Sequence, residues 1–394
     1  MHTLCQSPTD RAFVQNPYGF YARARAVAPL LLWEDYAMPA AFSYGAVSAL
    51  FRDSRLGRAA PPECSAPVPP HLAPFYDIEA HSLLELEPPH HTRLRALVLR
   101  AFTSRRIRAL APEIAALAHA LIDRFPPSGA FDLLPSFATQ VPVRIIARLL
   151  GVAESMWPQL LDWSHAMVAM YQARRDNQTE ERAVTATQAF SAFLRRWIEE
   201  KRANPGDDLI THLIAAQAEG DRLSLEEMIS TCILLLNAGH EATVHALGNG
   251  VKTLLAHENP LALLAPEHVE TTTEELLRFD PPLHMFTRYV YQDMTFGEMP
   301  LRKNTQVALV LGAANRDESQ WPQADRFMPE RPIKTHMAFG AGRHFCLGAP
   351  LARLEMQIAL PILMTRCPTL HLTAPPHYAD IYHFHGLERL MVAL

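Results

Sequence analysis

A long segment without proline, from Ser224 to about residue 257, is the feature that most limits what this chain can fold into. Ser224 followed by Glu227 is a capping-box pattern, which indicates that a helix begins here. The middle of the segment, residues 231–243, is apolar around most of the helix circumference, so we expect the helix to run through the core. A helix of about 33 residues is long for a globular protein and predicts a large, mainly helical fold.

Small residues in the middle of this segment indicate that another group approaches the helix closely. Gly239 costs about 1 kcal/mol relative to alanine inside a helix, so bulk is being avoided there. Ala238 and Ala242 are four residues apart and therefore share one face. They leave a shallow strip on which a ligand or the edge of a flat cofactor could lie.

Length and composition favour one large domain. The chain has 394 residues, 49% of them hydrophobic, and no change of composition divides it, so we expect a single domain over residues 1–394. The fold class that we expect is mainly α with small β-sheets. Helices are predicted near residues 13–27, 90–110, 112–124, 142–151, 155–172, 180–203, 224–257, 268–279 and 347–364, and strands near 30–34, 286–297 and 305–310.

A cluster of prolines at residues 61–74 predicts a long irregular loop. Loops of this length are usually functional or disordered. A substrate-contacting loop and a plain surface linker therefore both stay open for this segment.

Charge and cysteine usage limit the partners and the compartment. The net charge of -5 gives no global reason to expect nucleic-acid binding. The five cysteines are odd in number and widely scattered, which argues against a disulfide framework and for a reducing compartment, so we expect a cytoplasmic protein. The first residues lack a charged region followed by an apolar run, and no stretch reaches the roughly 18 apolar residues of a membrane span, so no membrane association is expected.

Cys346 lies in a glycine-flanked stretch, FGAGRHFCLGAPLAR at residues 339–353, which ends in the predicted helix near 347–364. A thiolate suits iron or zinc, but a structural zinc site needs further Cys or His ligands at close spacing, and no second cysteine stands nearby. A single thiolate can instead be the axial ligand of a haem. The alternative is that Cys346 is a small buried hydrophobic residue, as cysteines often are.

The spacing F-G-x-G-x-H-x-C-x-G in this stretch closely resembles the haem-binding signature of the cytochrome P450 family, the haem-thiolate monooxygenases. The resemblance implies a P450-like helical fold, haem b (iron protoporphyrin IX) as cofactor and Cys346 as the ligand of its iron. It also implies that O2 and two electrons from a ferredoxin or flavodoxin system oxidise a small organic substrate, for example by hydroxylation. Two other functions stay open, a peroxide-driven haem peroxygenase and a haem-based ligand sensor.

The glycines of the stretch suit such a site. Gly340 and Gly342 allow backbone conformations closed to other residues, so a tight loop can form under a flat macrocycle, and Gly348 lets the following helix approach it. Backbone N–H groups at the helix start favour an anionic sulfur. The residues expected to line the cofactor here and on the long helix are Phe339, Gly340, Gly348 and Ala238.

Residues 238–243 resemble the oxygen-binding helix of the family, whose usual pattern is Ala-Gly-x-Glu/Asp-Thr. Glu241 takes the acidic position, which implies proton relay from solvent; the alternative is an ion-paired carboxylate on the helix surface. Ala242 stands where the family usually has threonine, and Thr243 is no simple substitute, because one residue turns a side chain by about 100° around the helix. A polar group of the substrate, or a water that it fixes, is therefore expected to help deliver protons.

His240 and His245 belong to the same helix but do not form a zinc protease motif. That motif needs two histidines four residues apart, and these are five apart. His240 should point away from the face of Ala238 and Ala242, so we expect it to have a structural role.

Charged residues of the C-terminal half resemble a further family pattern. Glu275 and Arg278 match the E-x-x-R pair, and their i,i+3 spacing brings the two charges together on a helix. Residues 324–327 resemble the later arginine-bearing turn. The resemblance therefore implies a buried triad of Glu275, Arg278 and Arg326, with surface ion pairs as the alternative.

Haem propionates need cationic or hydrogen-bonding partners. His91 and Arg95 resemble the propionate-binding pair of the family, and Arg288 and His344 fall at two further positions of this kind. The same segment continues to Arg108 with several arginines and no acidic residue. A charge run is usually a solvated face, but in this family it implies a docking surface for an acidic electron-transfer protein.

Substrate-facing residues follow from the resemblance alone. Met and aromatic residues at helical spacing are otherwise more often core than pocket. His284, His385 and Asn237 are of interest because polar groups beside an apolar pocket orient a substrate. The full set expected to face the substrate is Phe75, Tyr76, Leu83, Leu84, Met167, Met170, Tyr171, Asn237, Ala238, Ala242, Leu283, His284, Met285, Phe384 and His385.

Overall fold

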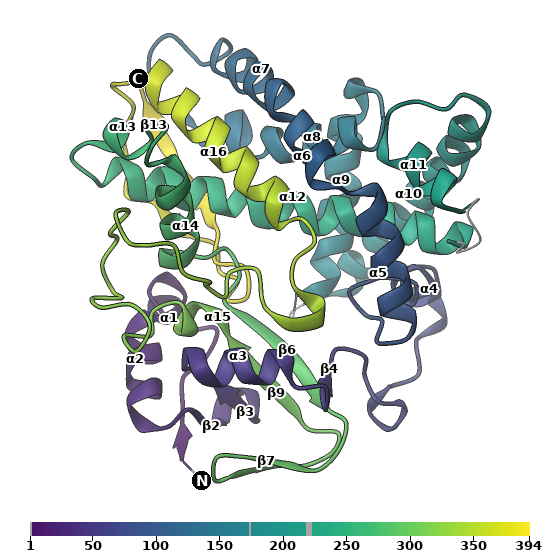
Figure 1. The fold of residues 1–394 in the computed structure, drawn as a ribbon, viewed down its shortest axis with the longest axis vertical. Helices are drawn as coiled ribbons and strands as arrows, with labels where there is room; N and C mark the ends of the chain where they lie inside the picture. Colours follow the sequence, from purple (N-terminus) through teal and green to yellow (C-terminus); the bar gives the residue numbers. More distant parts are fainter. Residues whose placement is uncertain (1, 173–174, 218–222) are drawn as a thin grey trace. The chain divides into compact units, whose positions relative to one another are not determined.

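The computed structural model describes residues 2–172, 175–217 and 223–394. The chain divides into two compact units, each assembled from separate segments: unit 1 comprises Met1–Cys64, Ile114–Thr139 and Ala242–Leu394, and unit 2 comprises Ser65–Glu113 and Gln140–Glu241. Helices predominate and the sheets are small, which confirms the predicted fold class (Figure 1). Among the described helices, none is long and apolar enough to cross a membrane.

Unit 1 contains a six-stranded sheet with the strand order β1-β2-β3-β9-β6-β4. Its two longest strands, β6 and β9, lie side by side (Figure 1). They are antiparallel, and Met285 pairs with Val310. The strands of this sheet are β1 (Thr3–Leu4), β2 (Leu30–Trp33), β3 (Met38–Ala41), β4 (Leu56–Gly57), β6 (Met285–Val290) and β9 (Gln306–Val310).

Helix α3 (Tyr44–Arg52) packs on this sheet. The Ser43 hydroxyl caps its first turn by accepting a hydrogen bond from the Ala46 N–H. Its apolar face joins Val307 and Leu309 of β9 in one buried cluster. A second cluster, rich in aromatic rings from α1 (Arg11–Gln15), α2 (Tyr18–Val27) and β2, contains Phe13, Phe20, Tyr21, Trp33 and Phe42.

Unit 1 contains several further helices. They are the second half of α12 (Leu225–Leu255), α13 (Pro260–Leu263), α14 (Val269–Phe279), α15 (Leu311–Ala314), α16 (Ala349–Arg366) and most of α7 (Ala111–Ile122). Three smaller sheets join β10 (His371–Leu372), β13 (Met391–Ala393) and β5 (Phe131–Asp132); β11 (His377–Tyr378) and β12 (Leu387–Arg389); and β7 (Met294–Phe296) and β8 (Met299–Leu301).

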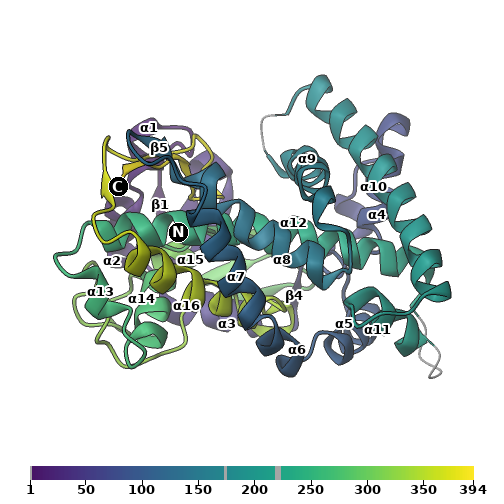
Figure 2. The ribbon, with the colours of Figure 1, turned by 90° about the horizontal axis from the view of Figure 1, so that it is seen from above.

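Unit 2 is helical in the part that the structure describes. Trp163 of α9 stacks on Phe190 of α10 with ring centroids 5.1 Å apart, which fixes these two helices side by side (Figure 2). Besides the first half of α12, the helices are α4 (Ala73–Glu79), α5 (His90–Ala101), α6 (Ser104–Ala109), α8 (Gln140–Leu149), α9 (Trp157–Val168), α10 (Asn177–Ala203) and α11 (Leu209–Gln217).

Helix α12 has the length that its sequence predicts, and Gly239 has the expected reason. A Cβ at Gly239 would lie 2.8 Å from Cδ1 of Ile146, a side chain of α8. The close approach of α8 therefore confirms that bulk is avoided at this position.

Several predicted elements are shorter or divided. The helix expected at 13–27 is interrupted at Asn16 and Pro17, and the helix expected at 90–110 is interrupted at Phe102, after which Thr103 caps α6. The strand expected at 286–297 is β6 followed by β7. The proline-rich segment 61–74 holds two short 3-10 turns and the first residues of α4. Helices α3, α4 and α11 were not predicted.

Candidate functional site

A tight loop before α16 presents the sulfur of Cys346. The N–H of Cys346 donates to the Phe339 carbonyl at 3.0 Å, and the N–H of Gly340 donates to the Met337 carbonyl at 2.8 Å. Gly348 is the N-cap of α16, and Cys346, two residues before it, is half-buried. The loop therefore holds one thiol at the N-terminal end of an 18-residue helix.

Two glycines give the loop its shape. Gly340 and Gly342 have φ values of +67° and +71°, a region that favours glycine. A Cβ at Gly342 would overlap the carbonyl oxygen of Phe51, the second-last residue of α3. Gly342 is thus required both by its backbone conformation and by the close approach of α3.

An ion-pair network lies directly behind the loop. Arg353 of α16 binds Glu274 of α14 through Nε and Nη2, at 2.5 and 2.8 Å, and its guanidinium lies 4.5 Å from the centroid of the Phe339 ring. Burial would raise the pKa of Glu274, but hydrogen bonds from Arg353 and His336 lower it to about 2. The carboxylate is therefore charged at neutral pH and anchors Arg353 against the loop.

The buried Glu275–Arg278 pair forms as predicted, but its third member differs. Arg278 donates from Nε and Nη2 to the two carboxylate oxygens of Glu275, at 2.6 and 2.7 Å. The second arginine on Glu275 is Arg331, whose Nε lies 3.2 Å from Oε1. The prediction of Arg326 was wrong: its side chain donates to Gln323, and only its backbone carbonyl accepts from Arg278.

The residues predicted to bind propionates belong to both units. In unit 1, Arg288 is buried in β6, with its guanidinium 4.9 Å from the centroid of the Phe51 ring, and His344 ends the short turn Gly342–His344 before Cys346. In unit 2, His91 is buried in the first turn of α5, and Arg95 is half-buried one turn later. Their binding role stays a prediction.

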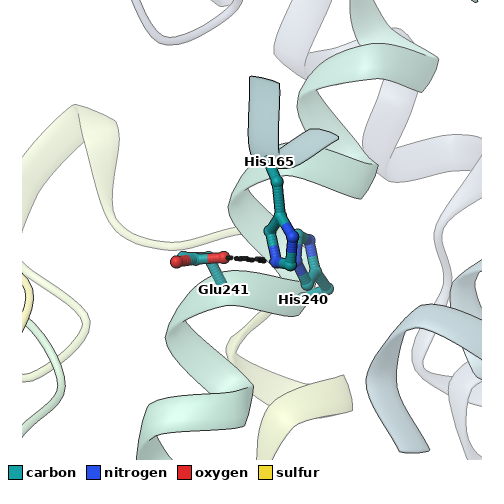
Figure 3. A group of neighbouring side chains, drawn as sticks. All are labelled: His165, His240 and Glu241. Carbon is teal, nitrogen blue, oxygen red and sulfur yellow. Dashed lines mark ion pairs between the residues drawn. The ribbon is translucent and has the colours of Figure 1, made fainter. Parts of the chain in front are cut away.

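Glu241 contacts two histidines within unit 2. Its Oε2 lies 3.2 Å from Nε2 of His240 and 3.7 Å from Nε2 of His165 on α9 (Figure 3). The His240 ring is fully buried, and its Nδ1 lies 3.1 Å from the Leu236 carbonyl oxygen. The sequence reasoning missed His165, because no spacing along the chain links it to Glu241.

The face of α12 that bears Ala238 is open. Ala238 is exposed although Asn237 and His240 beside it are buried. Ala242, one turn later on the same face, is half-buried, and Thr243 is buried. That a flat group lies on this strip of small residues stays a prediction.

Several residues predicted to face the substrate lie together in unit 2. Phe75 and Tyr76 are in α4 rather than in a loop, and the Phe75 ring centroid lies 6.3 Å from that of Tyr171. Asn237 donates from Nδ2 to the Met167 sulfur at 3.9 Å, and among the described residues its Oδ1 has no hydrogen-bond partner. Met170 is buried just after α9, and Leu83 and Leu84 lie in the turn after α4.

His284 and His385 lie in a buried polar group of unit 1. The Tyr21 hydroxyl lies 2.8 Å from Nδ1 of His284, and Nε2 of His385 lies 3.5 Å from Oδ1 of Asp280. Burial lowers the pKa of His284 well below its usual value and that of His385 to about 4, so both rings are neutral at neutral pH. Burial would raise the pKa of Asp280, but Lys252 holds it below its usual range.

These contacts give both histidines a packing role in the core, and their role toward a substrate stays a prediction. Leu283 and Phe384 form an isolated antiparallel bridge beside them. Met285 is buried at the start of β6.

Comparison with known proteins decides the family. The family model described as Cytochrome P450 matches residues 267–377, which include the Glu275–Arg278 pair and the Cys346 loop. Cytochrome P450 107B1 of Saccharopolyspora erythraea is 39% identical over 80% of this chain and 78% of its own length. The Vitamin D(3) 25-hydroxylase of Pseudonocardia autotrophica is 36% identical over 97% and 94%. The chain belongs to the cytochrome P450 family.

A solved structure supports the fold of this P450. The crystal structure of P450BioI in complex with hexadec-9Z-enoic acid ligated Acyl Carrier Protein matches with a TM-score of 0.90 and 33% identity, over 97% of this chain and 99% of that one. The protein is therefore an oxidoreductase with a P450 fold, and its relatives include monooxygenases and hydroxylases.

The residues of this P450 fit the haem that the family implies. The loop offers one half-buried thiol at a helix N-terminus, the surroundings in which a thiolate is favoured. In the same unit, the buried guanidinium of Arg288 suits an anionic edge. A thiol and a buried cation are groups that suit an iron-bearing, doubly anionic macrocycle.

Replacing Gly342 with alanine should weaken haem binding by this P450. The new Cβ would overlap the Phe51 carbonyl, and the left-handed backbone adds roughly 1–2 kcal/mol of strain. We expect less haem per chain in the purified variant, measured by the pyridine haemochrome method. Gly297→Ala is the matched control, because Gly297 has φ +57° but a Cβ there meets nothing within 4 Å. Equal haem content in the two variants would contradict the steric role of Gly342.

Proposed function

We propose that this P450 is a monooxygenase that uses O2 and two electrons from a ferredoxin or flavodoxin system to hydroxylate or otherwise oxidise a small organic substrate. The observation that supports this best is the Cys346 loop, which offers one thiol at the start of α16 and is braced by Phe51 and Arg353. A structural zinc site would need further ligands beside that sulfur. We take residues 1–394 to act as one cytoplasmic domain, because α12 belongs to both units and none of the five cysteines forms a disulfide.

Each group of residues has a distinct proposed role. Haem b, when bound through Cys346, supplies the activation of O2. His91, Arg95, Arg288 and His344 bind the propionates. Phe339, Gly340, Gly348 and Ala238 line the faces of the cofactor. Glu241 holds a proton source within reach of solvent, since its side chain is 21% exposed.

A substrate panel tests the proposed activity. Compounds that enter the site should shift the spin state of the haem iron, and the best of them should be oxidised when a ferredoxin or flavodoxin system is supplied. The names of the relatives suggest members of the panel: vitamin D3, mycinamicin IV, and hexadec-9Z-enoic acid both free and ligated to an acyl carrier protein. Failure of every electron donor to support turnover would refute the monooxygenase proposal and favour the peroxygenase or the sensor.

The basic run on α5 and α6 is the proposed docking surface for the electron donor. Arg100, Arg105 and Arg108 are exposed, whereas Arg106 is half-buried and donates to the Ala101 carbonyl at 2.8 Å. Exposed cations without a structural task are free to meet an acidic partner, and such steering speeds encounter.

Charge reversal of Arg100 and Arg105 to glutamate should slow reduction by an acidic ferredoxin roughly tenfold or more at low ionic strength. The deficit should shrink as salt rises, because exposed charges are screened. Stopped-flow reduction of the haem iron measures both effects. Reversal of Arg182 and Arg196, two exposed arginines of α10, changes the net charge equally and should have little effect. Equal slowing by the two double variants would refute docking at this surface.

Ala242 raises the question of how protons reach the reacting oxygen. A methyl group neither donates a hydrogen bond nor holds a water molecule. We infer that a polar group of the native substrate, or a water that it fixes, takes this part, with Glu241 as the proton source behind it. The buried Oδ1 of Asn237, without a partner among the described residues, is available to orient a donor group on that substrate.

The variant Ala242→Thr should therefore improve coupling selectively. General acid assistance typically contributes about 10²–10⁴-fold, so its absence shows as reducing equivalents lost to peroxide. Substrates with a suitably placed hydroxyl or carboxylate should couple well in the native enzyme, and analogues lacking that group should gain from the new threonine. The measurement is product formed per reduced nicotinamide consumed. If substrates and analogues coupled equally well in the native enzyme, and coupling fell only in Thr243→Val, then Thr243 would deliver the proton instead.

Ala242 also favours the second candidate, a peroxide-driven peroxygenase. Peroxide brings both the oxygen and the electrons, so such an enzyme does not depend on the threonine that delivers protons during O2 activation. Turnover with hydrogen peroxide that exceeds turnover with every tested electron donor would select this function.

A further inference from the structure

The two histidines around Glu241 pose an electrostatic problem. Nδ1 of His240 lies 3.1 Å from the Leu236 carbonyl oxygen, which only accepts, so Nδ1 carries the ring hydrogen. In a neutral ring, Nε2 is then an acceptor. It is fully buried, makes no hydrogen bond to any residue that the structure describes and lies 3.2 Å from Oε2 of Glu241, another acceptor. A cation between these two atoms removes the repulsion.

The distances fit a metal ion. Zinc binds His nitrogen and carboxylate oxygen at about 2.0–2.2 Å in a tetrahedron, which places neighbouring ligand atoms roughly 3.3–3.6 Å apart. The observed separations from Oε2 are 3.2 Å to His240 and 3.7 Å to His165, and all three ligand atoms lie within 4.8 Å of one another. Figure 3 shows both rings beside the Glu241 carboxylate.

The surroundings supply the other features of a zinc site. The contact from Nδ1 of His240 to the Leu236 carbonyl is the outer hydrogen bond that fixes the tautomer and orientation of a metal-binding imidazole. Ser164 adds a hydroxyl 3.3 Å from the same nitrogen. The His165 side chain is 54% exposed, which gives an ion a way in from solvent.

A second group of similar composition already contains a cation. Asp280, His284 and His385 also bring their ligand atoms within 4.8 Å of one another. There, however, the Lys252 ammonium already lies 2.5 Å from Oδ2 of Asp280. A divalent cation would add charge to a buried group that has its own cation, so that group is not a metal site.

We propose that His165, His240 and Glu241 form a binding site for Zn²⁺, with Nε2 of each histidine and Oε2 of Glu241 as ligands and a water molecule as the fourth. A bound zinc ion holds the Glu241 carboxylate and withdraws it from proton delivery. This consequence rests on the proposed function of Glu241, whereas the site itself does not. Zinc is therefore an inhibitor of coupled turnover that acts from the solvent side of α12.

Equilibrium dialysis of the haem-loaded enzyme, free of any affinity tag and treated with chelator, tests the site directly. At the same free zinc concentration, the native enzyme should bind one more zinc ion per haem than His165→Ala. The exposed His165 can be removed with little risk to folding. His268→Ala is the matched control, because His268 is exposed and its side chain caps nothing. It should bind as much zinc as the native enzyme.

Loss of one ligand should weaken binding by more than the roughly 10–100-fold that loss of an outer hydrogen bond costs. X-ray absorption at the zinc edge should show two imidazoles among light-atom ligands at about 2.0–2.1 Å. Equal zinc binding in the native enzyme and His165→Ala would overturn the site and leave an imidazolium–carboxylate ion pair.

Coupling measured with and without zinc tests the consequence. Zinc should lower product per nicotinamide in the native enzyme and have no such effect in His165→Ala. Glu241→Gln without zinc tests the proton role alone. Zinc that binds without changing coupling, together with normal coupling in Glu241→Gln, would refute the inhibition and the proton role of Glu241 while the metal site stands.

Discussion

Cys346→Ser should abolish the thiolate spectrum of this P450 and its monooxygenase activity. A serine hydroxyl at the same position is a poor donor for haem iron and cannot supply the electron density that a thiolate gives. The reduced carbon monoxide complex of the native enzyme should show the red-shifted Soret band of thiolate ligation, and the variant should lack it. Turnover with a substrate found in the panel should fall to background.

The cysteine that follows α16 provides the control for this result. Cys367 is the C-cap of the helix, is buried, and should be replaceable by serine with the spectrum unchanged. If Cys346→Ser kept the red-shifted band, another residue would have to ligate the iron, and the assignment of the site to this loop would be wrong.

Arg278→Met should destabilise the protein by about 3–5 kcal/mol, because it leaves Glu275 charged and buried without its main partner. Arg278 and Glu275 are 2% and 4% exposed. The guanidinium also donates to the carbonyls of Asn315 and Ala324 at 2.8 Å and of Arg326 at 3.0 Å, so its removal leaves three more acceptors without this donor. The measurement is the urea midpoint of the haem-loaded enzyme, followed by the Soret band.

An exposed pair makes the comparison specific. Arg302 and Asp293 lie 3.1 Å apart but are 74% and 61% exposed, so Arg302→Met should leave the midpoint nearly unchanged. Similar shifts in the two variants would mean that burial of the Glu275–Arg278 pair does not determine its contribution.

Local signals in the sequence were enough for the Cys346 loop and for α12. The loop depends on glycines at fixed offsets from the cysteine, and both positive φ angles fall where the pattern requires them. The helix was expected at residues 224–257 and runs from Leu225 to Leu255, because its cap and its apolar girth are both local properties.

Contacts between distant segments could not be predicted in the same way. Arg326 and Arg331 are five residues apart, and only the path of the chain after Ala324 decides that Arg331 reaches Glu275. Helix α3 was missed because three of its nine residues, Tyr44, Gly45 and Ser48, have lower helix propensity than alanine and weaken the helical pattern. His165 meets Glu241 through the packing of α9 on α12, for which the sequence holds no spacing rule.

The contact between α3 and the cysteine loop has a consequence for how the enzyme is made. Phe51 limits the space at Gly342, and the Tyr44 hydroxyl donates to the Thr335 carbonyl, 291 residues further along the chain. Closing so long a loop is entropically slow, and such non-local contacts form late in folding. Helix α3 is therefore synthesised early, whereas Thr335 and Gly342, which it contacts, leave the ribosome only near the end of translation. Haem capture should accordingly be a late, post-translational event.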